Sequence, residues 1–217
     1  MSRAKKLAGV RLDELASSVA FVVDGEAVRT KGKVGELLER ALGATGAGAQ
    51  MDFPDLEVEM KTVPLEAGKP AESTFVCALQ LMDAERASWE TSWVRKKLSR
   101  VLWVPVVRKR TAGESAGPAE EREAYFGEPL LWSPTLEQER ILAGDFDEVL
   151  GRIGAGGIEG VTAHVGRWLQ LRPKAAHGRV RTVVRAAEGD LVATVPRGFY
   201  LRAKFVGAVL RDVRALP

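Results

Sequence analysis

The segment that most constrains the fold is residues 52–62, Asp-Phe-Pro-Asp-Leu-Glu-Val-Glu-Met-Lys-Thr, where apolar and charged residues alternate. Successive side chains of a β-strand point to opposite faces of the sheet, so the alternation predicts a strand with one buried face. The apolar face would carry Leu56, Val58 and Met60, and the opposite face Glu57, Glu59 and Lys61. Neighbours on one face lie roughly 6.6 Å apart, which brings carboxylates and an ammonium together beside a core.

That charged face has a recognisable chemistry. Carboxylate oxygens are the ligands that Mg²⁺ prefers, and a nearby lysine can orient a water molecule and offset developing negative charge. Enzymes that hydrolyse phosphodiesters with a divalent metal use this combination. The triplet Glu59-Met60-Lys61 is short, however, and a solvated strand face produces the same pattern, so the triplet alone leaves both interpretations open.

A second acidic residue, Asp52, precedes Glu59 by seven positions, about 23 Å if the chain were extended. Two carboxylates that share a metal cannot be so far apart, so the chain must bend between them. Phe53-Pro54 is the expected bend, because proline cannot continue a central ladder. Asp55, directly after the proline, and Glu57, on the same face as Glu59, are the alternative acidic residues.

Hydrophobic periodicity predicts an α/β protein with a mixed sheet. The clearest helix spans 33–42, whose apolar residues form one stripe. Further helices are expected over 11–20, 90–100, 135–151 and 201–214, and strands over 55–63, 73–81, 101–107, 166–173 and 190–195. Gly154-Ala-Gly-Gly157 is expected to be a hinge, and the polar segment 108–124 a surface loop.

Composition excludes several classes of protein. No apolar run approaches the ~20 residues that cross a bilayer, and one cysteine with two histidines effectively excludes a Cys/His zinc site. The lone cysteine fits a reducing cytoplasm. Residues 167–217 hold eleven Lys/Arg against three Asp/Glu, within a chain of net charge +3. This uneven charge is typical of a basic face for a phosphate backbone beside a more acidic body, although a solvated basic surface is the alternative.

Several sequence blocks, in this order along the chain, carry a resemblance to a known family. They include Lys31-Gly-Lys-Val-Gly-Glu-Leu-Leu-Glu39, Asp52-Phe-Pro54, Glu59-Met-Lys-Thr62, Thr74-Phe-Val-Cys77, Leu130-Leu-Trp-Ser-Pro134, Leu169-Gln-Leu-Arg-Pro-Lys-Ala-Ala176 and Pro196-Arg-Gly-Phe-Tyr-Leu201. Together they resemble the MutH family of DNA mismatch-repair endonucleases, from about residue 20 to the end. The resemblance implies a restriction-endonuclease-like mixed sheet flanked by helices, with two lobes around a DNA-binding cleft. The expected lobes are 1–107, carrying the catalytic residues, and 108–217, carrying the DNA readout.

The resemblance also assigns the catalytic residues. It implies that Asp52 and Glu59 hold Mg²⁺, with Mn²⁺ as a substitute, and that Lys61 orients the nucleophile. Glu39 lies on the polar flank of its helix, where periodicity alone favours a solvent-facing role, but its match in the family helps to bind metal. Lys97, in a basic helical segment, matches an active-site lysine near the scissile phosphate. Its neighbour Lys96 stands where histidine is common in the family.

DNA readout is implied for residues outside the acidic cluster. The segment Arg172-Pro173-Lys174 would enter a groove, where arginine and lysine suit the O6 and N7 acceptors of guanine. Tyr200 would lie near the adenine and sense its methylation, and Lys31 and Phe75 would approach the DNA from the other lobe. The alternatives are core packing for Tyr200 and Phe75 and a phosphate contact alone for Lys31.

The expected activity follows from the resemblance. It is a Mg²⁺-dependent nick in the unmethylated strand of double-stranded DNA at hemimethylated GATC sites. The protein is expected to act as a monomer. MutL is expected to stimulate it directly, and MutS to act on it indirectly. One alternative is a restriction-type endonuclease that cuts both strands of GATC. Another is a DNA-binding module that has lost catalysis, against which the presence of all five charged catalytic candidates argues.

Overall fold

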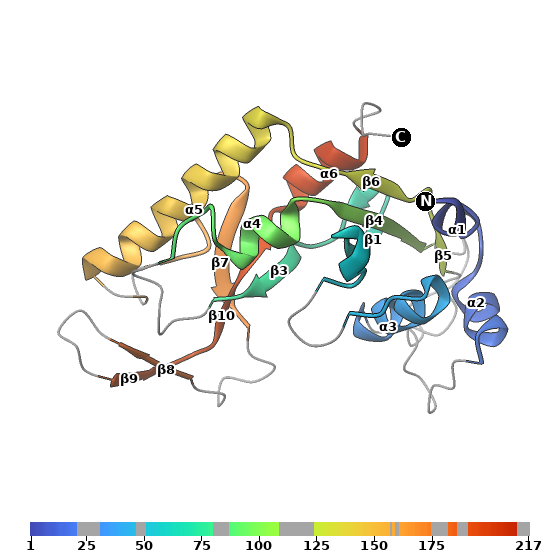
Figure 1. Cartoon of the computed structure of the whole chain (residues 1–217), viewed down its shortest axis with the longest axis horizontal. Helices are drawn as coiled ribbons and strands as arrows, with labels where there is room; N and C mark the ends of the chain where they lie inside the picture. The colour runs from blue at the N-terminus through green and yellow to red at the C-terminus, as the bar shows by residue number, and fades with distance from the viewer. Residues whose placement is uncertain are drawn as a thin grey trace, which may run out of the picture. The chain divides into compact units, whose positions relative to one another are not determined.

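Figure 1 shows the helices and strands of the chain. By their internal contacts they divide into two compact units. The computed structural model describes residues 1–20, 31–46, 51–79, 87–108, 124–156, 158, 161–174, 182–185 and 191–211. Unit 1 consists of Met1–Glu72, Arg100–Trp132 and Val209–Pro217, and unit 2 of Ser73–Ser99 and Ser133–Ala208. Each unit thus draws on both halves of the chain, so neither coincides with the expected segments 1–107 and 108–217.

Unit 1 is built on a five-stranded mixed sheet. At its centre, β1 (Glu59–Glu66) runs parallel to β4 (Val101–Arg108), with Glu59 opposite Val101. The other strands are antiparallel to these two: β2 (Lys69–Pro70) pairs with β1, and β5 (Ala124–Phe126) and β6 (Leu130–Trp132) pair with β4. The predicted α/β class with a mixed sheet flanked by helices is confirmed.

Three helices belong to unit 1: α1 (Ser2–Lys5), α2 (Leu12–Ser18) and α3 (Lys31–Leu42). Helix α3 lies against β1, and its predicted apolar stripe is buried in one core with Met60 and Leu102 of the sheet. Leu37 and Leu38 are fully buried, and each stabilises the fold by about 2 kcal/mol. The predicted helix over 33–42 is therefore confirmed, because one stripe matches one sheet face.

Unit 2 contains a three-stranded antiparallel sheet in the order β3 (Thr74–Ala78), β10 (Arg197–Leu201) and β7 (Leu169–Pro173). Helix α4 (Trp93–Leu98) packs on β3, α5 (Leu136–Gly156) packs on β7, and α6 (Ala203–Arg211) follows β10. The strands β8 (Thr182–Arg185) and β9 (Leu191–Thr194) form a separate antiparallel pair. Phe146 of α5 packs between two other aromatic residues, with its ring centre 5.4 Å from that of Phe199 and 5.8 Å from that of Trp89.

Three expectations about the elements were wrong. The first strand begins at Glu59, not at residue 55, because Pro54–Leu56 forms a 3₁₀ turn. Leu56 is consequently 62% exposed and does not join Val58 and Met60 in the core. The glycines at 154–156 are no hinge, since α5 continues to Gly156; isolated glycines cost a helix only about 1 kcal/mol each.

Strand β10 was not expected, although part of a family block was recognised there. The expected loop at 108–124 lies almost entirely outside the described residues. No helix in the described ranges combines the length and the apolar composition that crossing a bilayer requires.

Candidate active site

The turn between Asp52 and Glu59 closes the expected gap between these two carboxylates. Phe53 and Val58 pair across it: Phe53 N donates to Val58 O at 3.0 Å, and Val58 N donates to Phe53 O at 3.2 Å. Glu57 completes the reversal in the left-handed conformation, with φ of 51°. The predicted bend at Phe53-Pro54 is therefore confirmed.

Asp52 is joined directly to strand β1. One carboxylate oxygen, Oδ2, accepts a hydrogen bond from the backbone N–H of Met60 at 2.7 Å. This anchors the acid beside the residue that separates Glu59 from Lys61. The two alternative acids, Asp55 and Glu57, are exposed on the turn, whereas Asp52 is half-buried and bonded to the sheet.

Glu59 and Lys61 form a largely buried ion pair. Lys61 Nζ lies 2.6 Å from Glu59 Oε1. The Lys61 side chain is 13% exposed and the Glu59 side chain 4%. Both project from the face of β1 opposite Met60, because side chains alternate along a strand. Burial of two charges is tolerated only when they compensate each other, so the ammonium and the carboxylate depend on one another here.

Glu39 of α3 lies within the electrostatic field of the same cluster. Its burial raises the pKa of the Glu39 carboxyl above the ordinary value of 4.5, and the carboxylates of Asp52, Glu36 and Glu59 raise it as well. The Lys61 ammonium acts in the opposite direction. The cluster therefore gathers more negative charge than its lysine offsets, and either a proton or a cation relieves the excess.

The donor set fits a hard divalent cation by its chemistry, since carboxylate oxygens are what Mg²⁺ prefers. Among the described residues, however, no three carboxylate, imidazole or thiol side chains are already gathered closely enough to hold a metal ion. The expected metal ligands Asp52, Glu59 and Glu39 are therefore not already gathered around one point, and the reason is physical. Glu59 is turned toward Lys61, and Asp52 toward the Met60 N–H.

Lys97 and Lys31 are placed less completely. Lys97 is a half-buried residue of α4, in unit 2, whereas the carboxylates belong to unit 1, so its catalytic role stays a prediction. Lys31 is the first residue of α3, and its side chain lies outside the described part of the structure.

Four predicted DNA-binding side chains meet on the β3-β10-β7 sheet of unit 2. The rings of Phe75 and Tyr200 pack edge to face at 5.2 Å. The Arg172 guanidinium lies 5.7 Å from the centre of the Tyr200 ring, and Lys174 Nζ lies 4.1 Å from that of Phe75. We call Phe75, Arg172, Lys174 and Tyr200 the aromatic–basic cluster. Arg172, Pro173 and Lys174 are all exposed at the end of β7.

The positions of the two rings depend on local backbone features. The pairing of β3 with β10 shifts register between Phe199 and Tyr200, a bulge that leaves Val76 as the extra residue. Gly198 provides space for the Phe75 ring, because a Cβ there would lie 2.7 Å from Phe75 Cε2. Bulges of this kind commonly redirect side chains beside functional sites.

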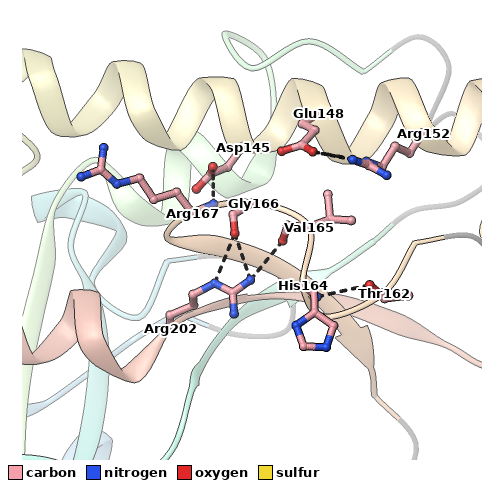
Figure 2. Close-up of polar contacts among 9 residues, drawn as sticks. All are labelled: Asp145, Glu148, Arg152, Thr162, His164, Val165, Gly166, Arg167 and Arg202. Atoms are coloured by element: carbon pink, nitrogen blue, oxygen red, sulfur yellow. Dashed lines mark hydrogen bonds and ion pairs between the residues drawn. The ribbon is translucent and has the colours of Figure 1, made fainter.

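A loop clamp that sequence reasoning missed supports the start of β7 (Figure 2). Asp145 of α5 accepts backbone hydrogen bonds from Arg167 at 2.6 Å, Trp168 at 2.7 Å and Leu169 at 2.8 Å. From the other side of the loop, Arg202 donates to the carbonyl oxygens of residues 163, 165 and 166. The loop is thus bonded to both helix α5 and the start of α6 immediately before the strand that carries Arg172.

The sequence does contain a signal for this clamp. Asp145 interrupts the apolar stripe of its helix, between Leu142, Phe146 and Val149, and it is 6% exposed. Gly166 is also required, since its φ of +79° and the 2.0 Å between an added Cβ and Leu169 O exclude a side chain. A carboxylate on a buried helix face is usually hydrogen-bonded, so an acid in an apolar stripe indicates donors from a neighbouring segment.

Comparison with known proteins bears on the whole chain. The family model described as "DNA mismatch repair enzyme MutH" matches residues 43–145. The DNA mismatch repair protein MutH of Serratia proteamaculans (strain 568) is 45% identical over 210 residues, which is 96% of this chain and 89% of the relative. The protein of the same name from Escherichia coli (strain K12) is 43% identical over 212 residues, 97% of this chain and 90% of its own.

Proposed function

Because the chain belongs to the MutH family of DNA mismatch repair proteins, we propose that it is a Mg²⁺-dependent endonuclease that nicks the unmethylated strand at hemimethylated GATC sites. The observation that carries the proposal is the hydrogen bond from Met60 N–H to Asp52, which unites Asp52 with the Glu59–Lys61 pair. The bond brings an acid from another segment beside the strand that carries one carboxylate and one ammonium, and metal-assisted phosphodiester hydrolysis uses such groups.

Asp52 and Glu59 would hold the metal, and Glu39 would support a second one. When bound, Mg²⁺ supplies a polarised water nucleophile and stabilises charge on the phosphate and the leaving oxygen. Burial is the first cause of the raised pKa of Glu39, and the neighbouring carboxylates of Asp52, Glu36 and Glu59 raise it further; their negative charge supports this role, because it favours a bound cation. Mn²⁺ offers the same oxygen-ligand preference and would substitute.

The lysines would act on the reacting groups. Lys61 is held by Glu59 at 2.6 Å, so its ammonium is oriented before substrate arrives and can position the attacking water. It also offsets negative charge that develops on the phosphate. Lys97 would assist electrostatically from α4, in a fold with two lobes around a DNA-sized cleft.

The aromatic–basic cluster would read the site. Arg172 and Lys174 present donors suited to guanine, and Pro173 between them would enter the same groove. Tyr200 would contact the adenine and sense its methyl group. Phe75 packs against Tyr200 but is only half-buried, and its exposed part supports a DNA contact in addition to packing. Lys31 would contact DNA from the other unit.

MutL would stimulate the monomer in the cytoplasm, and MutS would act through MutL.

Plasmid nicking tests the proposal. Supercoiled plasmids with hemimethylated, unmethylated or fully methylated GATC are incubated with the protein and Mg²⁺, with and without MutL. We expect open circles from the hemimethylated plasmid, with the break in the unmethylated strand, and no cleavage of the fully methylated plasmid or in EDTA. Linear product from the hemimethylated plasmid would instead indicate the restriction-type alternative. A gel shift without any cleavage would indicate a binding module.

A further inference from the structure

The hydroxyl of Ser73 lies between two donors from strand β7. Gln170 Nε2 donates to Ser73 Oγ at 2.8 Å, and an Arg172 guanidinium nitrogen donates to the same oxygen at 3.3 Å. These three residues bring together two segments that are 97 positions apart in sequence. Gln170 and Arg172 alternate with Leu169 and Leu171, which are fully buried, so the polar pair occupies the opposite face of the strand.

Gln170 is the fixed member of this group. Its side chain is buried, at 4% exposure, and it lies directly opposite Tyr200 in the β10–β7 pairing. A buried amide that loses its partner is costly, which keeps Gln170 bonded to Ser73. Since a hydroxyl oxygen has two lone pairs, the two donors together use both and fix the direction in which Ser73 accepts.

Arg172 is exposed, yet its guanidinium is held at two points. The Tyr200 ring lies 5.7 Å from its carbon, and Ser73 Oγ accepts from its nitrogen. A bidentate contact with guanine demands one orientation of the planar guanidinium, whereas a free arginine samples many. Contacts that hold the side chain before DNA binds reduce the entropy lost on binding.

We propose that Ser73, fixed by Gln170, is a positioning residue that sets the guanine selectivity of Arg172. The inference rests on the proposed function, in which Arg172 reads guanine. It assigns no chemistry to Ser73 and no direct contact with the base. Removing the hydroxyl would leave Arg172 in place and charged, so binding to the DNA backbone persists while discrimination between bases falls.

Equilibrium binding to matched duplexes tests this proposal. The duplexes carry one hemimethylated GATC site with either guanine or 7-deazaguanine, which lacks the N7 acceptor, and Ca²⁺ replaces Mg²⁺ to prevent cleavage. The ratio of the two Kd values measures guanine selectivity. Because 7-deazaguanine keeps the O6 acceptor and loses only one hydrogen bond of a bidentate pair, we expect the lower end of the range for such a pair, a ratio of roughly 5, for the unmodified protein. Arg172→Ala and Ser73→Ala should both bring that ratio close to 1, whereas Ser73→Thr, which keeps the hydroxyl, should preserve most of it.

The double variant separates positioning from general structural support. If Ser73 acts through Arg172, the combined Ser73→Ala and Arg172→Ala variant should have the same ratio as Arg172→Ala alone. Gln170→Met, which keeps the volume but removes the donor, should lower the ratio in the same direction. An unfolded variant would instead bind neither duplex, and thermal unfolding of each variant checks its fold.

The outcomes distinguish this inference from the proposed function. An unmodified protein with no preference for guanine overturns the guanine contact that the proposed function assigns to Arg172, and the inference with it, whereas plasmid nicking tests the endonuclease activity separately. An unmodified protein that prefers guanine, with a Ser73→Ala variant that retains the full ratio, overturns the inference alone. Additive losses in the double variant also overturn it, because Ser73 would then act independently of Arg172.

Discussion

The carboxylate of Asp52 accepts a hydrogen bond from the backbone N–H of Met60 at 2.7 Å, although the two residues are eight positions apart. This bond places an acid from the end of a loop beside the first residues of β1. The Glu59–Lys61 ion pair flanks the same backbone amide. The position of Asp52 beside the Glu59–Lys61 pair thus depends on the 3₁₀ turn that separates Asp52 from the strand.

Replacing Glu59 with Gln should abolish cleavage without abolishing DNA binding. The change removes a carboxylate but keeps the size of the side chain, and we expect cleavage to fall by at least about 100-fold. Single-turnover cleavage and gel-shift affinity measure the two effects. Glu57→Gln is the matched control, since Glu57 is exposed on the adjacent turn. Equal loss in both variants, or normal cleavage by Glu59→Gln, would remove Glu59 from the active site.

Stability should respond to pH through Glu39. Because the pKa of Glu39 is raised above 4.5 in the folded protein, folding favours its protonated form. Its ionisation therefore costs stability, fully so above the raised pKa, and the cost disappears as the pH falls to the unfolded value. Glu39→Gln should raise the unfolding free energy at pH 7 relative to the unmodified protein but have little effect below pH 4.5. Urea unfolding across this range measures the difference, and an equal difference at every pH would contradict the assignment.

Mg²⁺ should stabilise the unmodified protein more than it stabilises Glu39→Gln. A cation that binds the folded cluster raises the melting temperature according to its affinity, and the variant has one carboxylate fewer. Thermal unfolding with increasing Mg²⁺ measures the two shifts. Glu36→Gln is the control, because Glu36 is an exposed residue of the same helix that is paired with Lys33. Identical shifts in the unmodified protein and Glu39→Gln would show that Glu39 takes no part in metal binding.

Asp145→Ala should destabilise unit 2 and weaken DNA binding. The substitution leaves three backbone N–H groups without their acceptor, and we expect a loss of about 3 kcal/mol or more in the free energy of unfolding. Hydrogen exchange at the amides of residues 167–169 should accelerate, because they lose protection. Asp147→Ala, on the exposed side of the same helix, is the control. Unchanged exchange at these amides would mean that the clamp does not hold the loop.

Tyr200→Ser should reduce discrimination between methylation states. The change removes the ring that packs against Phe75 and lies near Arg172, and with it the proposed contact to adenine. Cleavage rates on hemimethylated and fully methylated duplexes give the discrimination as a ratio. Tyr200→Phe keeps the ring packing and separates the hydroxyl from the ring. If Tyr200→Ser retains the original ratio, the tyrosine serves packing alone.

Elements with a single-face pattern could be predicted from the sequence. Helix α3 has one apolar stripe, so its existence and its buried face both followed from periodicity. The bend after Asp52 followed from the reach of an extended chain together with a proline. In both cases a local property determined the result, and the structure agrees.

Features that depend on distant partners could not be predicted in this way. The segment at 74–78 was expected as a strand, but its pairing with β10 follows from contacts across more than a hundred residues, which periodicity does not encode. Such pairings also make each compact unit discontinuous in sequence. The turn at Pro54–Leu56 was mistaken for strand because alternating residues also fit a tight turn that Glu57 completes with a positive φ.

The candidate site was predictable in its residue types and less so in its contacts. The acids and the lysine followed from the chemistry and the resemblance, whereas the orientation of Glu59 toward Lys61 is a property of the folded pair. Ser73 was missed because nothing marks it in the sequence until its side-chain donors are known, and Asp145 because its position on an apolar stripe was not recognised as a signal.

Strand-resolved cleavage of a short duplex tests the central claim most directly. The duplex carries a single hemimethylated GATC site and a different label on each strand, and is incubated with the protein, MutL and Mg²⁺. The account predicts one break, in the unmethylated strand at GATC, that is absent in EDTA and with Glu59→Gln. Cleavage that persists in EDTA or with Glu59→Gln, or a duplex that is bound but left intact in both strands, would contradict it.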